Sequence, residues 1–206
     1  MPSKALAQLE VRLVDVEQML EAHEALTQFN SARTTAKKAA GDLTKLPDVL
    51  SALLKSPGPG KPTGVEAINR AGFLLAFAHF QGFVDDLHLE LAQIVLRGRA
   101  ANPTKIAELV KVPRANPHTE VIDKMFAGLG IYDLMDSISW KKCPNATVKA
   151  RLKKHLEARN KLAHGTALKI SKGTVKQTRD FVRILAKKLD ASCRTKAKAT
   201  TGSYPW

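Results

Sequence analysis

Hydrophobic residues recur at intervals of three and four along most of the chain, which is the spacing of amphipathic α-helices. This pattern predicts helices over residues 4–28, 65–97, 118–128, 146–164 and 174–192, and short helices near 45–55 and 104–111. From Phe73 to Val84 the sequence is apolar on nearly every side of a helix, so 65–97 is predicted to be the longest helix, central and buried. The expected fold is an all-α, antiparallel helical bundle with short accessory helices.

The stretch SPGPGKPTG, residues 56–64, is rich in Pro and Gly and interrupts the helical pattern. It is not a phosphate-binding loop, because its Gly and Lys spacing differs and Pro62 stands where such a loop needs a backbone donor. We therefore expect three segments. Residues 1–64 form an N-terminal helical region and linker packed on the same domain, 65–194 form a helical domain, and 195–206 form a flexible, disordered basic tail.

The positive charge of the chain is concentrated in its last third. Residues 1–140 hold 15 Lys and Arg against 16 Asp and Glu, whereas residues 141–206 hold 18 against 3, and the net charge of the chain is +14. Such asymmetry indicates either a polyanionic partner, with nucleic acid as the leading candidate, or a solvated basic face.

The sequence favours a protein of a reducing compartment without a membrane segment. The most apolar window, residues 71–84, is shorter than a membrane span and contains His79 and Gln81. Cys143 and Cys193 are 50 residues apart and no CxxC occurs, so neither a zinc site nor a disulfide framework is indicated. We expect a cytoplasmic protein with no membrane partner.

The segment EARNKLAHG places three polar side chains at the end of the basic helix 146–164, just before Gly165. Asn160 and His164 are one helical turn apart, and the long Arg159 side chain can bend towards the same face. A His can exchange protons with the ribose 2′-OH or the leaving oxygen, an Arg can stabilise charge on the phosphorus, and an Asn can position either. The expected RNA-binding residues are Arg151, Lys153, Lys154, His155 and Lys161.

Metal binding is an alternative chemistry for the charged end of helix 65–97. Asp86 and Glu90 lie one turn apart and could share a metal ion with His88 or His79. No second cluster of ligands accompanies them, so a solvated helix end is favoured. We therefore predict no metal site and no cofactor.

The segment LEARNKLAHG resembles the signature of the HEPN domain, an Arg and a His separated by four to six residues with a polar residue after the Arg. Three further segments resemble parts of the RiboL-PSP-type HEPN family: FLLAFAHFQGFVDDL its second helix, VIDKMFAGLGIYDLM the segment before its motif helix, and GTVKQTRDFVRILAKKLD its closing helix. The resemblance covers roughly residues 65–192.

This resemblance implies a HEPN-like helical bundle that forms a homodimer, with the two motifs meeting in an interfacial cleft. It implies a metal-independent endoribonuclease in a toxin or defence role, which leaves 2′,3′-cyclic phosphate and 5′-OH ends on RNA. Arg159 and His164 become the catalytic residues and Asn160 a supporting one. An antitoxin or regulatory partner would accompany a toxin role.

The sequence departs from the family where related nucleases often carry a Glu on the second helix. Gln81 stands there, and Asp85 and Asp86 follow one turn later, so these two become candidates for an auxiliary acid. Two functions stay open at this point: an endoribonuclease, and a non-catalytic module that binds RNA or a protein partner.

Overall fold

The computed structural model describes residues 1–40, 63–96 and 116–206. Its helices are α1 (Lys4–Ala40), α3 (Thr63–Val95), α5 (Thr119–Ala127), α6 (Asn145–Ala163) and α7 (Lys172–Thr201), with a short 3-10 helix, η2 (Met135–Ser137), between α5 and α6. No strand occurs in these three ranges, so the predicted all-α fold is confirmed.

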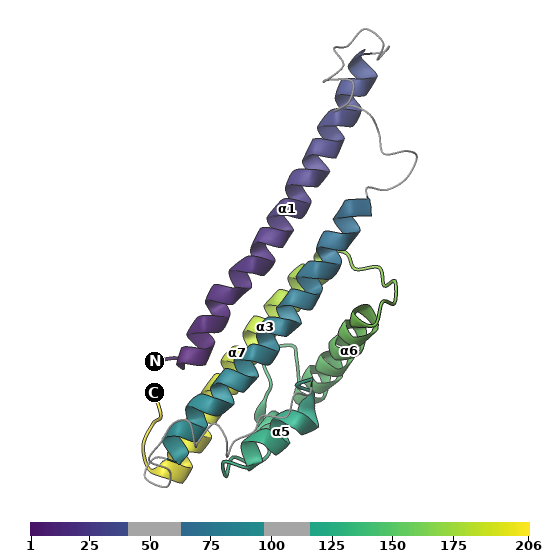
Figure 1. Ribbon diagram of the computed structural model, residues 1–206. Coiled ribbons are helices and arrows are strands. Elements are labelled where there is room, and N and C mark those ends of the chain that lie inside the picture. Colours follow the sequence, from purple (N-terminus) through teal and green to yellow (C-terminus); the bar gives the residue numbers. More distant parts are fainter. Residues whose placement is uncertain (41–62, 97–115) are drawn as a thin grey trace.

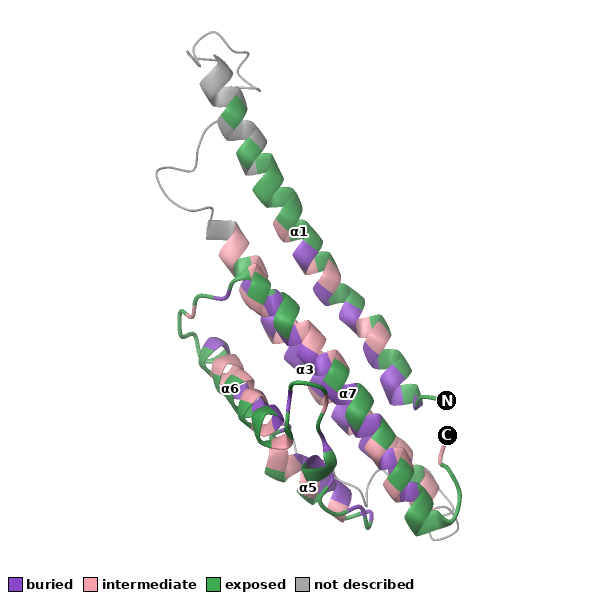
Figure 2. Ribbon diagram, turned by 180° about the vertical axis from the view of Figure 1, so that it is seen from behind, coloured by how far each residue is buried: buried purple, intermediate pink, exposed green. Residues whose placement is uncertain are grey.

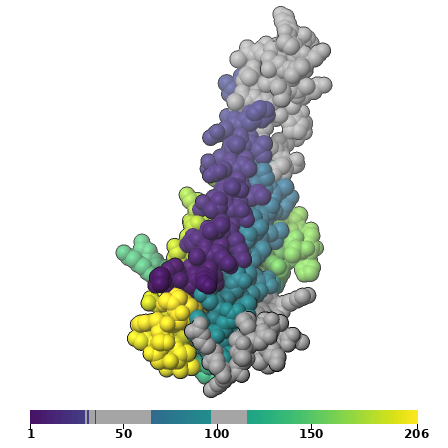
Figure 3. Space-filling model, turned by 60° about the vertical axis from the view of Figure 1, so that its left-hand side comes forward, coloured from purple at the N-terminus to yellow at the C-terminus, as the bar shows by residue number. Residues whose placement is uncertain are grey.

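Helix α3 is the centre of the bundle and contacts α1, α5, α6 and α7. Helices α1 and α7 lie alongside α3, whereas α5 and α6 cover the side of α3 away from α1 (Figure 1). Helices α1 and α6 run antiparallel to α3, and the two chain termini lie at the same end of the bundle (Figures 1 and 3). Among the described helices, none combines the length and apolar character needed to cross a membrane.

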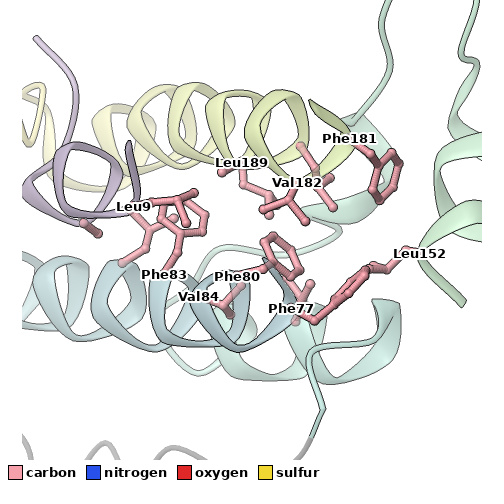
Figure 4. Close-up of a cluster of buried hydrophobic side chains, with 14 of the residues drawn as sticks. Leu9, Phe77, Phe80, Phe83, Val84, Leu152, Phe181, Val182 and Leu189 are labelled. Atoms are coloured by element: carbon pink, nitrogen blue, oxygen red, sulfur yellow. The ribbon is translucent and has the colours of Figure 1, made fainter. Parts of the chain in front are cut away.

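Four phenylalanines explain the central position of α3. Phe73, Phe77, Phe80 and Phe83 follow each other at intervals of three and four, and each is at most 2% exposed. Burying each such ring contributes about 1.5–3 kcal/mol to folding. Figure 4 shows Phe77, Phe80 and Phe83 in a cluster with side chains of three other helices: Leu9, Leu152, Phe181, Val182 and Leu189.

Helix α1 is fixed to the bundle at its N-terminus by two acidic side chains. The backbone N–H groups of Lys4 and Ala5 donate to the Glu90 carboxylate, each at 3.1 Å, and the N–H of Ser3 donates to Asp190, also at 3.1 Å. These carboxylates satisfy the free N–H groups of the first helical turn. Further along, Leu9, Leu13 and Val16 are fully buried, so the first half of α1 belongs to the same core.

The expectation that residues 65–97 form the longest helix is wrong. At 37 residues α1 is longer than α3, which has 33, because the Ala- and Lys-rich stretch after residue 30 continues the helix. Most of residues 21–29 is exposed, so this half of α1 projects along the outside (Figure 2). The short helices predicted near 45–55 and 104–111 lie outside the described residues.

The predicted flexible tail, residues 195–206, is also wrong. Helix α7 continues to Thr201 because Lys and Ala favour helix, and Gly202 ends it with a φ of 79°. The last residues then fold back onto the helix. Arg194 donates to the Trp206 carbonyl at 3.0 Å, and Arg194 and Lys198 lie over the Tyr204 ring at 4.5 and 4.1 Å.

Helix α6 is attached to the core by an aromatic contact that includes a histidine. The His155 ring lies 5.6 Å from Phe77 and 5.3 Å from Phe181. Burial, followed by the charges of Arg151 and Lys154, lowers the pKa of His155 to about 4. His155 is therefore neutral at physiological pH and serves packing, so we remove it from the residues expected to bind RNA phosphate.

This packing predicts an acid-sensitive contribution to stability. Because the pKa of His155 is lower in the folded protein than in the unfolded chain, stability is complete above about pH 6.5 and falls as the pH drops towards about 4. The unfolded chain binds the proton in this window and the folded protein does not. Chemical denaturation from pH 7.5 to 4.5 should show a shallower loss for His155→Phe than for the wild type. Parallel curves for the two proteins would contradict this account.

Candidate active site

Helix α6 carries the Arg159, Asn160 and His164 motif on a surface set by its buried side. Val148, Leu152, Leu156 and Leu162 are buried against the core, so the remaining faces of the helix point outward. At the first residue of the helix, the Asn145 side chain donates to the carbonyls of Met135 and Ile138, at 2.6 and 2.9 Å, and fixes the entering loop. The buried stripe and this loop together fix the orientation of α6 about its own axis.

Helix α6 ends where the sequence predicts. Gly165 has a φ of 81°, which favours glycine, and its N–H donates to the Leu162 carbonyl at 3.1 Å. The N–H of Thr166 donates to the Lys161 carbonyl at 2.9 Å. This pair of hydrogen bonds forms a Schellman cap and makes His164 the C-cap residue, directly after Ala163.

Arg159, Asn160 and His164 lie together at this end of α6. Arg159 Nη1 donates to Asn160 Oδ1 at 3.2 Å, and both side chains are half-buried. The backbone N–H of His164 donates to the Asn160 carbonyl at 3.0 Å, while His164 itself is exposed. The arrangement offers a guanidinium and an amide joined by a hydrogen bond, one helical turn before an exposed histidine.

Asn116 is a further member of this site that sequence reasoning missed. Its Nδ2 donates to Asn160 Oδ1 at 2.7 Å from the segment just before α5. Asn160 Oδ1 thus accepts two hydrogen bonds, and its Nδ2 group is left as the donor that the amide presents. The two asparagines are 44 positions apart, and no local pattern in the sequence signals such a pairing.

A groove runs from Asn160 along α6 to the start of α5. Its volume is about 590 Å³, and its walls combine amides, charged side chains and a small apolar floor. The lining residues are Asn116, His118, Thr119, Glu120, Lys149, Ala150, Lys153, Leu156, Glu157 and Asn160. This volume is in the range of small-molecule and cofactor sites.

The predicted RNA-binding residues have different surroundings. Lys153, Lys154 and Lys161 are exposed on α6. The Arg151 guanidinium lies 4.8 Å from the centre of the Phe181 ring and is half-buried, so part of its surface is used in packing. The three lysines therefore carry the accessible positive charge of this helix.

Asp85 and Asp86 lie in a different environment from the motif. Asp86 accepts from Arg12 at 2.9 Å, which connects α3 to α1. Burial, followed by the neighbouring charge of Asp86, raises the pKa of Asp85 to about 6. An acid with this pKa can be protonated near neutral pH.

Asp85 and Asp86 lie far from Arg159, Asn160 and His164 of the same chain, measured along the bundle axis. His155 packs on Phe77, and α6 runs antiparallel to α3 (Figure 1). At about 1.5 Å per residue, Asp85 lies about 12 Å beyond Phe77 in one direction and His164 lies about 13 Å beyond His155 in the other. The fold thus does not bring Asp85 or Asp86 beside the motif of its own chain.

The side chains considered for a metal site each have another partner. His88 Nε2 is bonded to the Met125 carbonyl at 2.9 Å, His79 is paired with Asp15 at 3.1 Å, and Glu90 binds the start of α1. Within the three described ranges, no group of three or more His, Cys, Asp or Glu side chains is arranged to hold a metal ion. Both cysteines are buried and unpaired.

One family model matches the chain, over residues 42–194, which is more than half of its 206 residues. The family is described as RiboL-PSP-HEPN. The match includes α3, α5, α6 and most of α7 and leaves out α1, although α1 contributes to the same core. No curated protein and no solved structure matches the chain.

The Asn116–Asn160 hydrogen bond predicts thermodynamic coupling between the two side chains. In a cycle of Asn116→Ala, Asn160→Ala and the double variant, the free energies of unfolding should deviate from additivity by about 0.5–1.5 kcal/mol. Urea denaturation measures this difference. Asn116→Ala combined with Asn145→Ala is the matched control and should be additive, because the Asn145 amide bonds to other carbonyls. Additivity in both cycles would contradict the coupling.

Proposed function

The chain belongs to the RiboL-PSP-HEPN family, and on this basis we propose that it is a metal-independent endoribonuclease. The observation that carries the proposal is the grouping of Arg159, Asn160 and His164 at the solvent-facing end of α6. This grouping supplies a proton carrier, a cation and an amide donor where an RNA strand can reach them. A toxin or defence role, with an antitoxin or regulatory partner, is part of the same proposal.

The proposed reaction is attack of a ribose 2′-oxygen on the adjacent phosphorus. The 2′-OH loses its proton, the new bond to phosphorus forms, the bond to the 5′-oxygen breaks, and the leaving 5′-oxygen takes up a proton. The products are a 2′,3′-cyclic phosphate and a 5′-OH end. His164 exchanges one of these protons, Arg159 stabilises the charge on the phosphoryl oxygens, and Asn160 positions the phosphate through its Nδ2 group. No metal ion takes part in these steps.

A second copy of the chain would complete the acid–base pair. One motif offers one histidine, whereas the reaction needs a group that removes a proton and a group that supplies one. A two-fold axis beside the exposed His164 would place two identical motifs on one cleft. We therefore include a homodimer in the proposal.

Loss of His164 should abolish cleavage without unfolding the protein. With a mixed RNA pool in EDTA, the rate of cleavage by His164→Ala should fall by about 10²–10⁴-fold relative to the wild type. His79→Gln is the matched control, because His79 pairs with Asp15 on α1 and should leave the rate unchanged. Product ends are identified by mass spectrometry.

Two results would contradict the assignment. Cleavage that His164→Ala retains would remove this residue from the chemistry, and cleavage that EDTA abolishes would contradict a metal-independent reaction. If the folded wild type binds RNA but cleaves none of the pool, the chain is a non-catalytic RNA-binding module instead.

The exposed lysines of α6 should hold the RNA backbone. Replacing Lys154 or Lys161 by Ala should weaken binding of single-stranded RNA and lower the slope of log Kd against log salt by about 0.7 for each phosphate that the protein no longer neutralises. Fluorescence anisotropy at a series of salt concentrations measures both quantities. Lys188→Ala removes an exposed charge from α7 and is the control. Equal slopes for all variants would contradict a role of α6 in RNA binding.

A further inference from the structure

The groove between α6 and the start of α5 begins at the motif but is not explained by phosphate chemistry. Its walls include Glu120 and Glu157, and carboxylates repel a phosphate backbone. One carboxylate oxygen of Glu120 is hydrogen-bonded to His118 Nδ1 at 2.7 Å, so Glu120 already has a partner. Glu157 is exposed and forms no hydrogen bond or ion pair with another residue in the described part of the chain. An acceptor of this kind suits a ligand group that donates hydrogen bonds.

Lys153 stands one helical turn before Glu157 on the same groove wall. It too is exposed, and no ion pair joins the two side chains to each other or to other described residues. Lys149, one turn earlier, is paired with Asp136 instead. The wall therefore carries one cationic donor and one carboxylate side by side, neither of them paired within the described part of the chain.

This pair matches one edge of an RNA base. The Watson–Crick edge of guanine presents the O6 acceptor followed by two adjacent donors, N1–H and the N2 amino group. A carboxylate accepts both donors at once, and a lysine donates to O6. Adenine, cytosine and uracil lack two adjacent donors on this edge, so they cannot make the same paired contact.

The opposite wall and the end of the groove fit the rest of a nucleotide. His118, at the N-cap of α5, provides an exposed planar ring whose orientation is held by Glu120, and bases stack on such rings. At the end of the groove, the Asn116–Asn160 bond joins the wall to the catalytic motif. A base in the groove would therefore belong to a nucleotide next to the phosphate at Asn160.

We infer that this groove is a guanine-binding subsite, in which Glu157 accepts from the base edge, Lys153 donates to it and His118 stacks on the ring. The inference rests on the proposed endoribonuclease function and names the base that adjoins the cleaved bond. Lys153 thereby contacts the base, while Lys154 and Lys161 bind the phosphate backbone of the RNA.

Binding of RNA that cannot be cleaved tests the subsite apart from catalysis. The probes are 2′-O-methyl oligouridine hexamers with one internal guanosine, inosine or adenosine, and the readout is Kd by fluorescence anisotropy. The wild type should bind the guanosine probe about 10- to 100-fold more tightly than the adenosine probe. Inosine lacks the N2 amino group, so its affinity should fall between the two.

Glu157→Gln should remove most of this preference, because an amide offers one acceptor and a donor that opposes the N2 amino group. Glu21→Gln is the matched control, since Glu21 is an exposed carboxylate on α1. Circular dichroism confirms that both variants are folded. Equal binding of the three probes by the wild type, or an unchanged preference in Glu157→Gln, would overturn the inference.

The two proposals fail in different ways. A guanosine preference that depends on Glu157, without cleavage of any RNA, would retain the subsite and overturn the nuclease. Cleavage that depends on His164, at sites without a guanosine preference, would retain the nuclease and overturn the subsite.

Discussion

The packing of one narrow stripe of α6 against α3 and α7 determines where Arg159, Asn160 and the α6 wall of the groove lie. Leu152 and Leu156 insert into the core, and the His155 ring packs on Phe73 and Phe77 of α3. A helix fixed in this way cannot rotate without exposing its apolar side, which would cost several kcal/mol. The motif therefore keeps its direction towards solvent, and the groove keeps its shape.

Hydrogen bonds then position the functional groups at the end of this helix. The Schellman cap at Gly165 ends α6 at Ala163, and the C-cap residue His164 is exposed. The Asn116 amide, from another part of the chain, donates to Asn160 Oδ1. The Nδ2 group of Asn160 is then the donor that this side chain presents. Positioned donors of this kind stabilise developing charge without a reorganisation cost during the reaction. The long helix α1 lies outside the matched family region but buries the opposite side of α3.

The sequence predicted the features that depend on local spacing. The period of the apolar residues located α3, α6 and α7, and Gly165 marked the end of α6. Features that depend on contacts between distant residues were missed or misjudged. Nothing near Asn116 indicates its bond to Asn160, and His155 looked like a surface residue because its aromatic neighbours come from α3 and α7. The tail looked disordered for a similar reason, since Tyr204 and Trp206 bind residues one to three helical turns earlier.

Attack by the ribose 2′-oxygen is tested with one RNA sequence in two forms, in the presence of EDTA. The first form is all ribose, and the second has a single 2′-deoxy nucleotide on the 5′ side of the cleaved bond. The account predicts that the wild type cuts the first form to 2′,3′-cyclic phosphate and 5′-OH ends and leaves that bond in the second form intact. Cleavage of the same bond in both forms would contradict attack by the 2′-oxygen, and with it the mechanism built on Arg159 and His164.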